Sequence, residues 1–375
     1  MAEVQPNNKG GSITMGLNPF AKGTFVGVDV GHHNIKVAQL EKTASGFKIS
    51  KYGTCLTPAD AVKDGIVVDT ASTGEALKHL LKQSDIRATS AIVAVSGGSV
   101  VVRPARVPKM NEATLRKSIK FEAGRYVPTS AEDSFIEFEI IGDVDETQMD
   151  VLIVAAPKDT VESRLTVCEL AGLEVECVDV EPFAAYRSLI ESDPNGQWLN
   201  KTIALVDIGG AATNLSVVAG GVFAMARSLP HGGQTLTEAL KTYFRLSNDD
   251  AESGKAQLDL RELTDDTPKE NPPLRVVQPH IDDLVREIRR SLNYFQSGGA
   301  EGGPQGKAVE MVVLSGGGSK LPGIAEYLSH KLGMPAVSLG IYDNTAFTNW
   351  SEEGGQGLEL GVVAGLALRP FAKAA

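Results

Sequence analysis

The sequence predicts an α/β protein built from two similar domains around a central cleft. The order strand, glycine turn, strand, strand occurs twice, at residues 24–54 and again at 202–229. In both copies the first strand has an aspartate near its end, in the pattern Asp-x-Gly. A third glycine-rich turn follows a later apolar strand, at 312–318. A chain of 375 residues is long enough for two domains with sizeable cores.

Strand and helix patterns alternate through the first half of the chain. Apolar residues in short alternating runs predict strands, and apolar residues three and four apart predict helices. Asn111 is a candidate helix cap, and Pro182 suits the first turn of a helix. We expect strands through residue 54, a helix at 73–83, strands at 91–96 and 100–108, a helix at 112–126, strands at 135–141 and 149–157, a helix at 159–171, a strand at 173–180 and a helix at 182–190.

The second half repeats the opening pattern and then becomes more helical. The segment 281–296 is strongly amphipathic, with Ile281, Leu284 and Ile288 on one face, which predicts core packing rather than membrane contact. After the strands at 202–229 we expect a helix at 233–244, a surface loop at 261–275, the helix at 281–296, a connector at 298–306, a strand at 309–315, a helix at 324–332 and an apolar terminal helix at 357–370.

These elements predict four parts. Residues 1–23 lack periodicity and are expected to form a disordered arm. The first domain core is expected at 24–89 and 179–202, with the terminal helix 357–370 packing back onto it. An extra subdomain is expected at 90–178, and the second domain at 203–356.

The composition is that of a globular protein with an acidic balance. Hydrophobic residues make up 42% of the chain, charged residues 22%, and the formal net charge is -11. Because nucleic-acid-binding proteins normally carry a basic excess, no nucleic-acid partner is expected. The cysteines Cys55, Cys168 and Cys177 are too few and too scattered for a disulfide framework or a zinc site, which favours a cytosolic protein. No stretch reaches the roughly 18 apolar residues of a membrane span.

The glycine turns have the composition of a phosphate-binding site. Glycine lets backbone N–H groups approach a phosphate, and successive N–H groups form an anion-binding nest. Asp29 and Asp207, at the two strand ends, can hold a hydrated Mg²⁺ beside such phosphates. One turn alone is more often a hairpin corner, but three of the same kind predict a nucleotide cleft. The candidate contacts are Gly31, His32, His33 and Asn34 in the first turn, Gly209, Gly210 and Thr213 in the second, and Gly316, Gly317, Gly318 and Lys320 in the third.

In order and spacing these segments resemble the actin-like ATPase superfamily, which includes actin, heat-shock chaperone ATPases, sugar kinases, MreB and FtsA. The segments 26–40, 204–221 and 312–323 match its two phosphate hairpins and its adenosine loop. The resemblance implies the actin-like ATPase fold and ATP with Mg²⁺ as cofactors. Glu181, which opens the segment that looks like the connecting helix, is the candidate for orienting an attacking water. The remaining nucleotide contacts that the resemblance implies are Gly232, Gly233, Glu252 and Lys255.

Within that superfamily, the middle of the chain is similar to the PilM family of type IV pilus assembly proteins. The similarity rests on Arg-Pro-Ala-Arg-Val-Pro at 103–108, on Glu-Ala-x-Arg-Tyr-Val-Pro at 122–128, and on the run from Leu170 to Leu189. PilM-like proteins are cytoplasmic, bind ATP, and capture the N-terminal cytoplasmic peptide of the membrane protein PilN. The resemblance therefore implies an extra FtsA- and PilM-type subdomain, and a role in the pilus assembly platform at the inner membrane. Contacts with other pilus motor components and with a second copy of the chain stay open.

The partner peptide is expected to lie along the strand 100–107 beside the helix 112–126. An extended strand offers main-chain hydrogen bonds, and the helix beside it offers side chains for packing. The resemblance to PilM implies that this peptide is apolar, with a Pro or an Asn. A basic island runs from Arg103 to Arg125, and it is interpreted either as a solvated helix face or as a surface for acidic headgroups. The candidate partner contacts are Val100, Val101, Val102, Arg103, Arg106, Glu122 and Tyr126.

The first turn departs from the family pattern. His32, His33 and Asn34 stand where family members often have small hydroxyl residues, so backbone donation is kept but a hydroxyl contact is lost. Weak ATP hydrolysis, or none, is expected. The histidines are interpreted as exposed turn residues rather than a metal pair, because adjacent residues rarely face the same way.

Two other functions stay open. A small-molecule kinase needs a base and a pocket for the acceptor hydroxyl, and the stretch 99–108 supplies no obvious acid. An FtsA-like filament-forming protein would carry an amphipathic membrane helix at its C-terminus. The tail here has only Arg369 and Lys373 as charged residues after 360 and no polar face, which argues against direct anchoring.

Overall fold

The computed structural model describes residues 24–127, 130–264, 270–298, 302–304, 306–348 and 356–371. The predicted disordered arm, 1–23, lies outside the described residues. Among the described residues, no helix combines the length and the apolar character that crossing a membrane requires.

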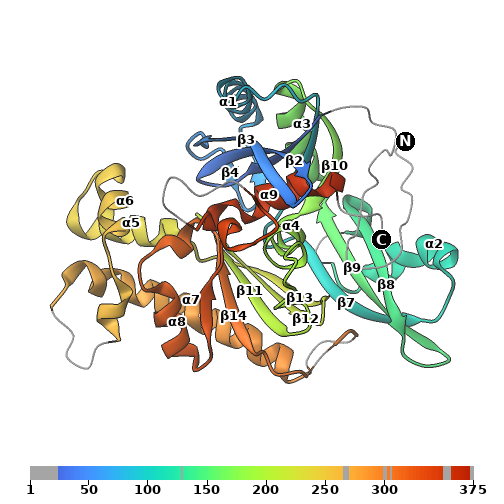
Figure 1. Cartoon of the computed structure of the whole chain (residues 1–375). Helices are drawn as coiled ribbons and strands as arrows, with labels where there is room; N and C mark the ends of the chain where they lie inside the picture. The colour runs from blue at the N-terminus through green and yellow to red at the C-terminus, as the bar shows by residue number, and fades with distance from the viewer. Residues whose placement is uncertain are drawn as a thin grey trace.

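Two five-stranded sheets share one strand order. In each sheet the central strand pairs antiparallel with the strand that follows it and parallel with a later strand. This confirms the predicted duplication of an α/β core, and Figure 1 shows the first sheet above the second. The first sheet has the order β10 (Glu174–Val180), β6 (Ser90–Val95), β1 (Phe25–Val30), β2 (Asn34–Thr43) and β3 (Gly46–Leu56). The second has the order β15 (Ala336–Ser338), β14 (Met311–Ser315), β11 (Thr202–Ile208), β12 (Thr213–Ala219) and β13 (Val222–Leu229).

Amphipathic helices cover the outer sides of the two sheets. In the first domain, α1 (Thr70–Gln83) packs against α3 (Lys158–Leu170), beside the short strands β4 (Val62–Lys63) and β5 (Ile66–Val67). In the second domain, the apolar stripe of α7 enters one core with strands β11, β12 and β14. The helices of the second domain are α5 (Gly233–Phe244), α6 (Asn248–Ala256), α7 (Pro272–Gln296) and α8 (Ile324–Leu332).

The start of α7 corrects the sequence prediction. The loop expected at 261–275 ends early, because the helix begins at Pro272 rather than at Ile281. Asn271 caps it, its side chain accepting a hydrogen bond from the Leu274 amide at 3.3 Å. Amides in the first turn have no hydrogen-bond partner within the helix, so a proline there loses no bond. Residues that usually break a helix therefore begin one here.

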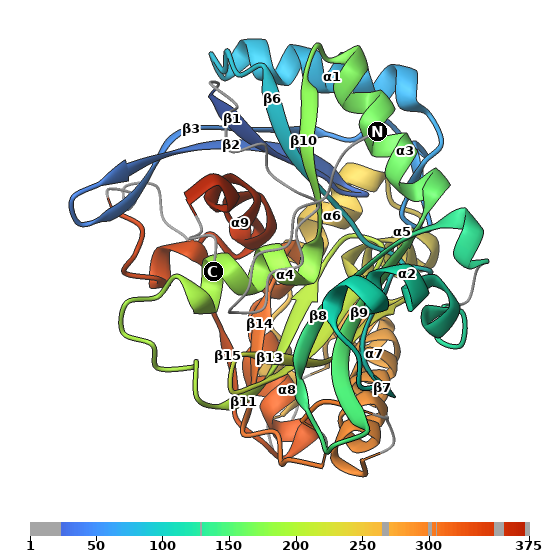
Figure 2. The same cartoon turned by 90° about the vertical axis from the view of Figure 1, so that its right-hand side faces the viewer.

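Two helices form a layer between the sheets, as Figure 2 shows for α4 (Glu181–Tyr186) and α9 (Gly361–Leu368). The chain of α4 continues through one π-helical turn, Arg187–Glu191. All eight residues of α9 are buried, which accounts for the apolar tail of the sequence. A Cβ on Gly365 would lie 1.8 Å from the carbonyl oxygen of Ala184, so the glycine permits the close crossing of α9 and α4.

The extra subdomain is a three-stranded sheet with one helix. Its strands are ordered β7 (Val101–Pro108), β9 (Gln148–Pro157) and β8 (Ser134–Asp143), and α2 (Glu112–Ala123) packs on one face. The bounds expected from sequence, 90–178, are too wide, because β6 and β10 pair with β1 or with each other in the first sheet and α3 packs on α1. The order of strands along the sequence does not show which sheet a buried strand joins.

Candidate functional site

The three glycine turns meet at one place between the domains. A Cβ on Gly210 in the second turn would lie 3.2 Å from the Cβ of His33 in the first. A Cβ on Gly316 in the third turn would lie 2.6 Å from a carboxylate oxygen of Asp207. Gly316 also has a φ of 87°, a left-handed conformation that favours glycine. Gly317, by contrast, faces open space.

The first two turns have the same internal geometry. The Gly31 amide donates to the carbonyl of Asn34 at 3.0 Å, and the Gly209 amide donates to the carbonyl of Ala212 at 2.9 Å. Thr57 braces the first turn, since its hydroxyl donates to the Gly31 carbonyl at 2.7 Å. Both turns are therefore closed by the same backbone hydrogen bond.

The two strand-end aspartates occupy equivalent positions but have different partners. Asp29 on β1 lies opposite Lys36 on β2, and the buried pair forms an ion pair of 2.8 Å. Asp207 on β11 lies opposite Asn214 on β12, so it has no cation in that position. Burial, and then the nearby carboxylate of Glu181, raise the pKa of Asp207 to about 7.

Glu181 joins the two aspartates in a group of carboxylates, of which Asp29 is buried and Glu181 and Asp207 are half-buried. Its Oε2 accepts a hydrogen bond from the Asn214 side-chain amide at 2.8 Å. Burial, followed by the proximity of Asp29, raises the pKa of Glu181. Buried carboxylates are stable as anions only beside positive charge, so this group is suited to a bound cation.

Two cations at this site were missed by the sequence interpretation. Lys36 could have been found by pairing the residues of the first hairpin, which sets it opposite Asp29. Arg164 on α3 had no signal in the sequence, because it lies far along the chain from the first turn. Its guanidinium is buried, and its Nη2 donates to the carbonyl of Val30 at 3.3 Å.

The predicted adenosine-side residues lie together on α5 and α6. The Lys255 ammonium contacts Glu252 and the Thr237 hydroxyl, each at 2.8 Å, and the Gly233 carbonyl at 3.3 Å. Burial alone would raise the pKa of Glu252, but hydrogen bonds from Lys255 and Thr237 outweigh it and lower the pKa. A Cβ on Gly233 would lie 4.0 Å from the Cα of Gly318, which joins this group to the third turn.

Some predicted contacts already have other partners. Thr213 is fully buried and donates its hydroxyl to the His231 carbonyl at 2.6 Å, so the hydroxyl expected to face a phosphate is not available. The Gly233 amide donates to the Gly209 carbonyl at 2.9 Å and thereby supports the second turn, while a Cβ on Gly232 would clash with that turn's Gly210 carbonyl. Lys320 forms an ion pair of 2.6 Å with Glu359.

The paired histidines of the first turn differ in environment. His33 is exposed and His32 is half-buried. Partial burial and the neighbouring His33 lower the pKa of His32. Among the described residues, no three His, Cys, Asp or Glu side chains gather as direct metal ligands.

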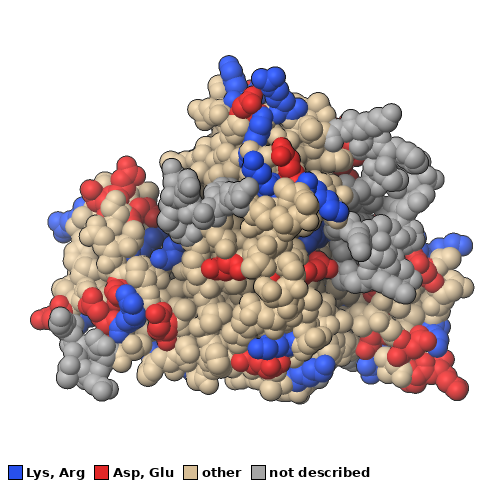
Figure 3. All heavy atoms as spheres, in the orientation of Figure 1, with Lys and Arg blue, Asp and Glu red and all other residues tan. Residues whose placement is uncertain are grey.

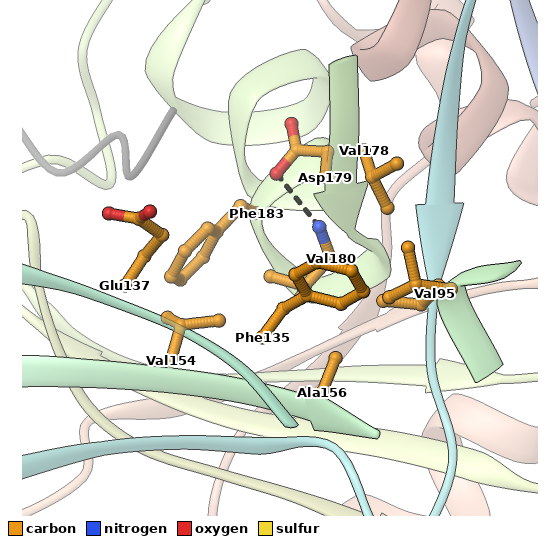
Figure 4. A pocket seen from close by; sticks show the side chains of 10 residues that line it. Val95, Phe135, Glu137, Val154, Ala156, Val178, Asp179, Val180 and Phe183 are labelled. Atoms are coloured by element: carbon orange, nitrogen blue, oxygen red, sulfur yellow. Dashed lines mark hydrogen bonds between the residues drawn. The ribbon is translucent and has the colours of Figure 1, made fainter. Parts of the chain in front are cut away.

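A second hollow lies between the extra subdomain and the first domain. Its cavity volume is about 30 Å³, within about 390 Å³ of space that includes open solvent. Figure 4 shows side chains from several strands and from α4 converging on it, with Phe183 beside Glu137. We call it the groove, and its lining residues are Val95, Phe135, Glu137, Val154, Ala156, Val161, Val178, Asp179, Val180 and Phe183.

The groove is not where the sequence placed the partner site. Alternation along β9 directs Val151 and Ile153 under α2, whereas Val154 and Ala156 line the groove on the other face. The seven predicted partner residues, from Val100 to Tyr126, are absent from its lining. The outer edge of β7 is also covered, because β7 packs beside β13.

Most of the basic island is neutralised within the extra subdomain. Arg106 pairs with Asp150 at 2.9 Å, and Lys109 pairs with Asp143 at 2.6 Å. Arg103 instead stacks over the Tyr126 ring at 4.8 Å. These pairs favour the interpretation of a solvated surface, and the face in Figure 3 carries acidic and basic side chains interspersed.

Comparison with known proteins identifies the family. The family model described as "Type IV pilus assembly protein PilM" matches residues 27–371. The chain belongs to the PilM family. A solved PilM-PilN type IV pilus biogenesis complex is 26% identical to it, with a TM-score of 0.79, covering 92% of this chain and 98% of that chain.

More distant relatives share the architecture. FtsA, the cell division protein of Bacillus subtilis (strain 168), is 22% identical over 344 residues, covering 80% of this chain and 74% of FtsA. MreB 5 of Spiroplasma citri, solved bound to AMPPNP, has a TM-score of 0.50 at 14% identity, covering 94% of this chain and 96% of that chain. Together with the duplicated sheets, these likenesses establish the actin-like ATPase fold for this PilM-family chain.

Proposed function

We propose that this PilM-family protein binds ATP with Mg²⁺ between its two domains. The observation that carries the proposal is the meeting of three glycine turns around the carboxylates of Asp29, Glu181 and Asp207. A nucleotide bound to MreB 5, which has the same fold, supports it.

Each group has a defined role in this proposal. Asp29 and Asp207 hold the hydrated Mg²⁺ through water, and the ion neutralises charge on the phosphates. Backbone amides of the first two turns and the ammonium of Lys36 bind the phosphates. Gly317 borders the open space for the adenosine, near Glu252 and Lys255.

Conservative variants of the aspartates test this site. Asp29→Asn and Asp207→Asn should weaken Mg-ATP binding more than tenfold, because each removes a charge that holds the cation, about 1.4 kcal/mol per tenfold. Isothermal titration of each variant gives the affinity, and melting without nucleotide gives the stability. Asp85→Asn, a surface aspartate in an exposed ion pair with Lys51, is the matched control. Parent-like binding by both site variants would refute the cleft assignment.

Hydrolysis is proposed to be slow, with Glu181 orienting the attacking water. Burial raises the pKa of Glu181, which disfavours the carboxylate form, and the carboxylate is the form that accepts a proton from water. Glu181→Gln should therefore abolish whatever turnover a phosphate-release assay detects. Unchanged turnover in that variant would remove Glu181 from this role.

We further propose that the groove captures the N-terminal cytoplasmic peptide of a PilN-like membrane protein, which would recruit the chain to the inner membrane. The PilM-PilN complex supports this partner. The groove is mainly apolar, and β8 at its border has no strand on its outer edge among the described residues. An extended apolar peptide can add to such an edge and fill the pocket with its side chains.

Variants at two exposed phenylalanines distinguish peptide binding in this groove from binding at the site that the sequence suggested. Phe135 lines the groove and is 36% exposed, whereas Phe121 on α2 is 74% exposed. With a fluorescent synthetic peptide of the first residues of the organism's PilN, Phe135→Ala should weaken binding about tenfold or more, as removal of a buried anchor does. Phe121→Ala should leave binding unchanged. The reverse pattern would return the partner site to α2.

A further inference from the structure

Arg164 on α3 is a buried arginine whose hydrogen-bonding capacity is largely unused. It is 2% exposed, and its Nη2 donates to the carbonyl of Val30, the residue before the first glycine turn. Its Nε and Nη1 have no hydrogen-bond partner among the described residues. Unpaired donors of a buried charge lower stability, so their presence calls for a functional explanation.

The charges that act on Arg164 belong to the nucleotide site. Burial lowers the pKa of its guanidinium, and the carboxylates of Glu181 and then Asp29 oppose that shift. In the structure the guanidinium has one arrangement, bound to the Val30 carbonyl, and its Nε and Nη1 remain available for a second partner.

The same helix borders the groove. Helix α3 begins at Lys158 directly after β9 ends at Pro157, and Val161 in its first turn lines the groove. Arg164 follows three residues later, so both side chains project from one side of the helix. A second short link is β10, where Val180 lines the groove and the next residue is Glu181.

Helix α3 is fixed to its neighbours at two points. The Ser163 hydroxyl oxygen accepts a hydrogen bond from the Val67 amide at 3.2 Å. A Cβ on Gly74 in α1 would lie 2.6 Å from the Cβ of Leu170, so α1 and α3 are in close contact near the end of α3. Val161 and Arg164 are one turn apart on this anchored helix, so packing at Val161 bears directly on the position of Arg164.

We propose that Arg164 is a positioning residue that couples occupancy of the groove to the first phosphate turn. This rests on the proposed function, since it needs a peptide in the groove and a nucleotide in the cleft. In this proposal, a peptide packed on Val161 and Val180 and a nucleotide in the cleft both favour the guanidinium at the Val30 carbonyl over an arrangement in which it turns to Glu181. Because coupling between sites is reciprocal, each ligand raises the affinity for the other by the same factor.

The test measures that factor directly. The affinity for Mg-AMPPNP is titrated with and without saturating PilN peptide, in the parent and in three variants. The parent should bind nucleotide about fivefold or more tightly with peptide present, the lower range of such couplings. Arg164→Met should reduce the factor to about one, the value for uncoupled sites, whatever its affinity for nucleotide alone. Arg164→Lys, which keeps the charge, should restore part of it.

Ser163→Ala is the matched control, because it loosens the same helix without touching the turn. It should lower the melting temperature and keep the parent's coupling factor. A parent-like factor in Arg164→Met, or a factor of one in the parent, would overturn the inference while leaving both binding sites intact. A parent that binds neither ligand would instead refute the proposed function.

A measurement on the parent protein covers the case in which Arg164→Met does not fold. Peptide alone, without nucleotide, should slow hydrogen exchange of the amides at 31–34, because the turn is held through the Val30 carbonyl. Unchanged exchange at these amides with the groove saturated would also overturn the inference.

Discussion

The ion pair between Lys36 and Asp29 differs from a surface pair of the same length only in its surroundings. The side chains of Lys36 and Asp29 are 13% and 8% exposed, and those of Lys51 and Asp85 are 35% and 66% exposed, with both pairs at 2.8 Å. Removing one partner of a buried pair leaves an uncompensated charge, which costs about 3–5 kcal/mol. An exposed pair contributes at most about 1 kcal/mol.

Lys36→Met should therefore lower the free energy of unfolding by several kcal/mol, and Lys51→Met by less than about 1 kcal/mol. Urea denaturation at neutral pH measures both. Equal losses in the two variants would mean that Asp29 finds another partner in the absence of Lys36.

Asp207 makes stability depend on pH in a direction opposite to most carboxylates. Its pKa is about 7 in the folded state and 3.8 when unperturbed, so the folded protein binds more protons between those values. Stability therefore falls as pH rises from about 4 to about 7. One pKa unit corresponds to about 1.4 kcal/mol, so a shift of this size opposes folding by a few kcal/mol at pH 8.

Asp207→Asn should remove this dependence, because the amide carries no charge at any pH. The melting temperature of the nucleotide-free variant should exceed the parent's at pH 8 and match it at about pH 4, where the parent carboxyl is already protonated in the folded state. Calorimetric scans at the two pH values measure the difference. An equal change at both would show that the effect comes from packing rather than ionisation.

At the scale of elements, the contact of α9 with α4 depends on the absence of one side chain. A Cβ on Gly365 would lie 1.8 Å from the Ala184 carbonyl oxygen, within the layer that joins the two sheets. Gly254 in α6 has open space around its missing Cβ. Both glycines are helical, so comparing their alanine variants distinguishes the effect of a steric clash from the effect of helix propensity.

Gly365→Ala should destabilise the protein by about 3 kcal/mol or more, because a buried backbone contact must open. Gly254→Ala should stabilise α6 by up to about 1 kcal/mol through helix propensity. Chemical denaturation of both variants is the measurement. A stabilising Gly365→Ala would mean that α9 can shift away from α4 without loss.

At the scale of the whole molecule, the structure argues against direct membrane binding by the described residues. The apolar helix α9 is buried between the sheets, and most of the basic island is paired internally. Lys117 and Lys120 on α2 form no ion pair with a described residue, and each such residue near anionic lipid contributes only about 1 kcal/mol.

The protein alone should therefore remain in the supernatant when anionic vesicles are pelleted. Vesicles that display a lipid-linked PilN peptide should recruit it, because the peptide supplies the affinity that the surface lacks. Pelleting without the peptide, and its loss in a Lys117→Glu, Lys120→Glu variant, would assign the exposed face of α2 to the membrane.

The sequence by itself determined the features that depend on neighbours along the chain. Each aspartate-glycine turn is local, so Asp29, Asp207 and the repeated strand order were visible without coordinates. Periodicity likewise located most helices, and α5 and α8 begin and end where it placed them. The start of α7 was not predicted because proline disrupts the interior of a helix but suits its first turn, and the sequence alone did not show which case applied.

Only the tertiary structure decided what depends on contacts between distant segments. The apolar pattern of β6 and β10 would suit a buried strand in either sheet, and only the structure shows that both belong to the first sheet. The groove forms where β8 and β9 of the extra subdomain meet β10 and α4, so no single segment of the sequence predicts it. Thr213 and Arg164 acquired their partners in the same way, since hydrogen-bonding groups inside a core pair with the residues that the fold brings near.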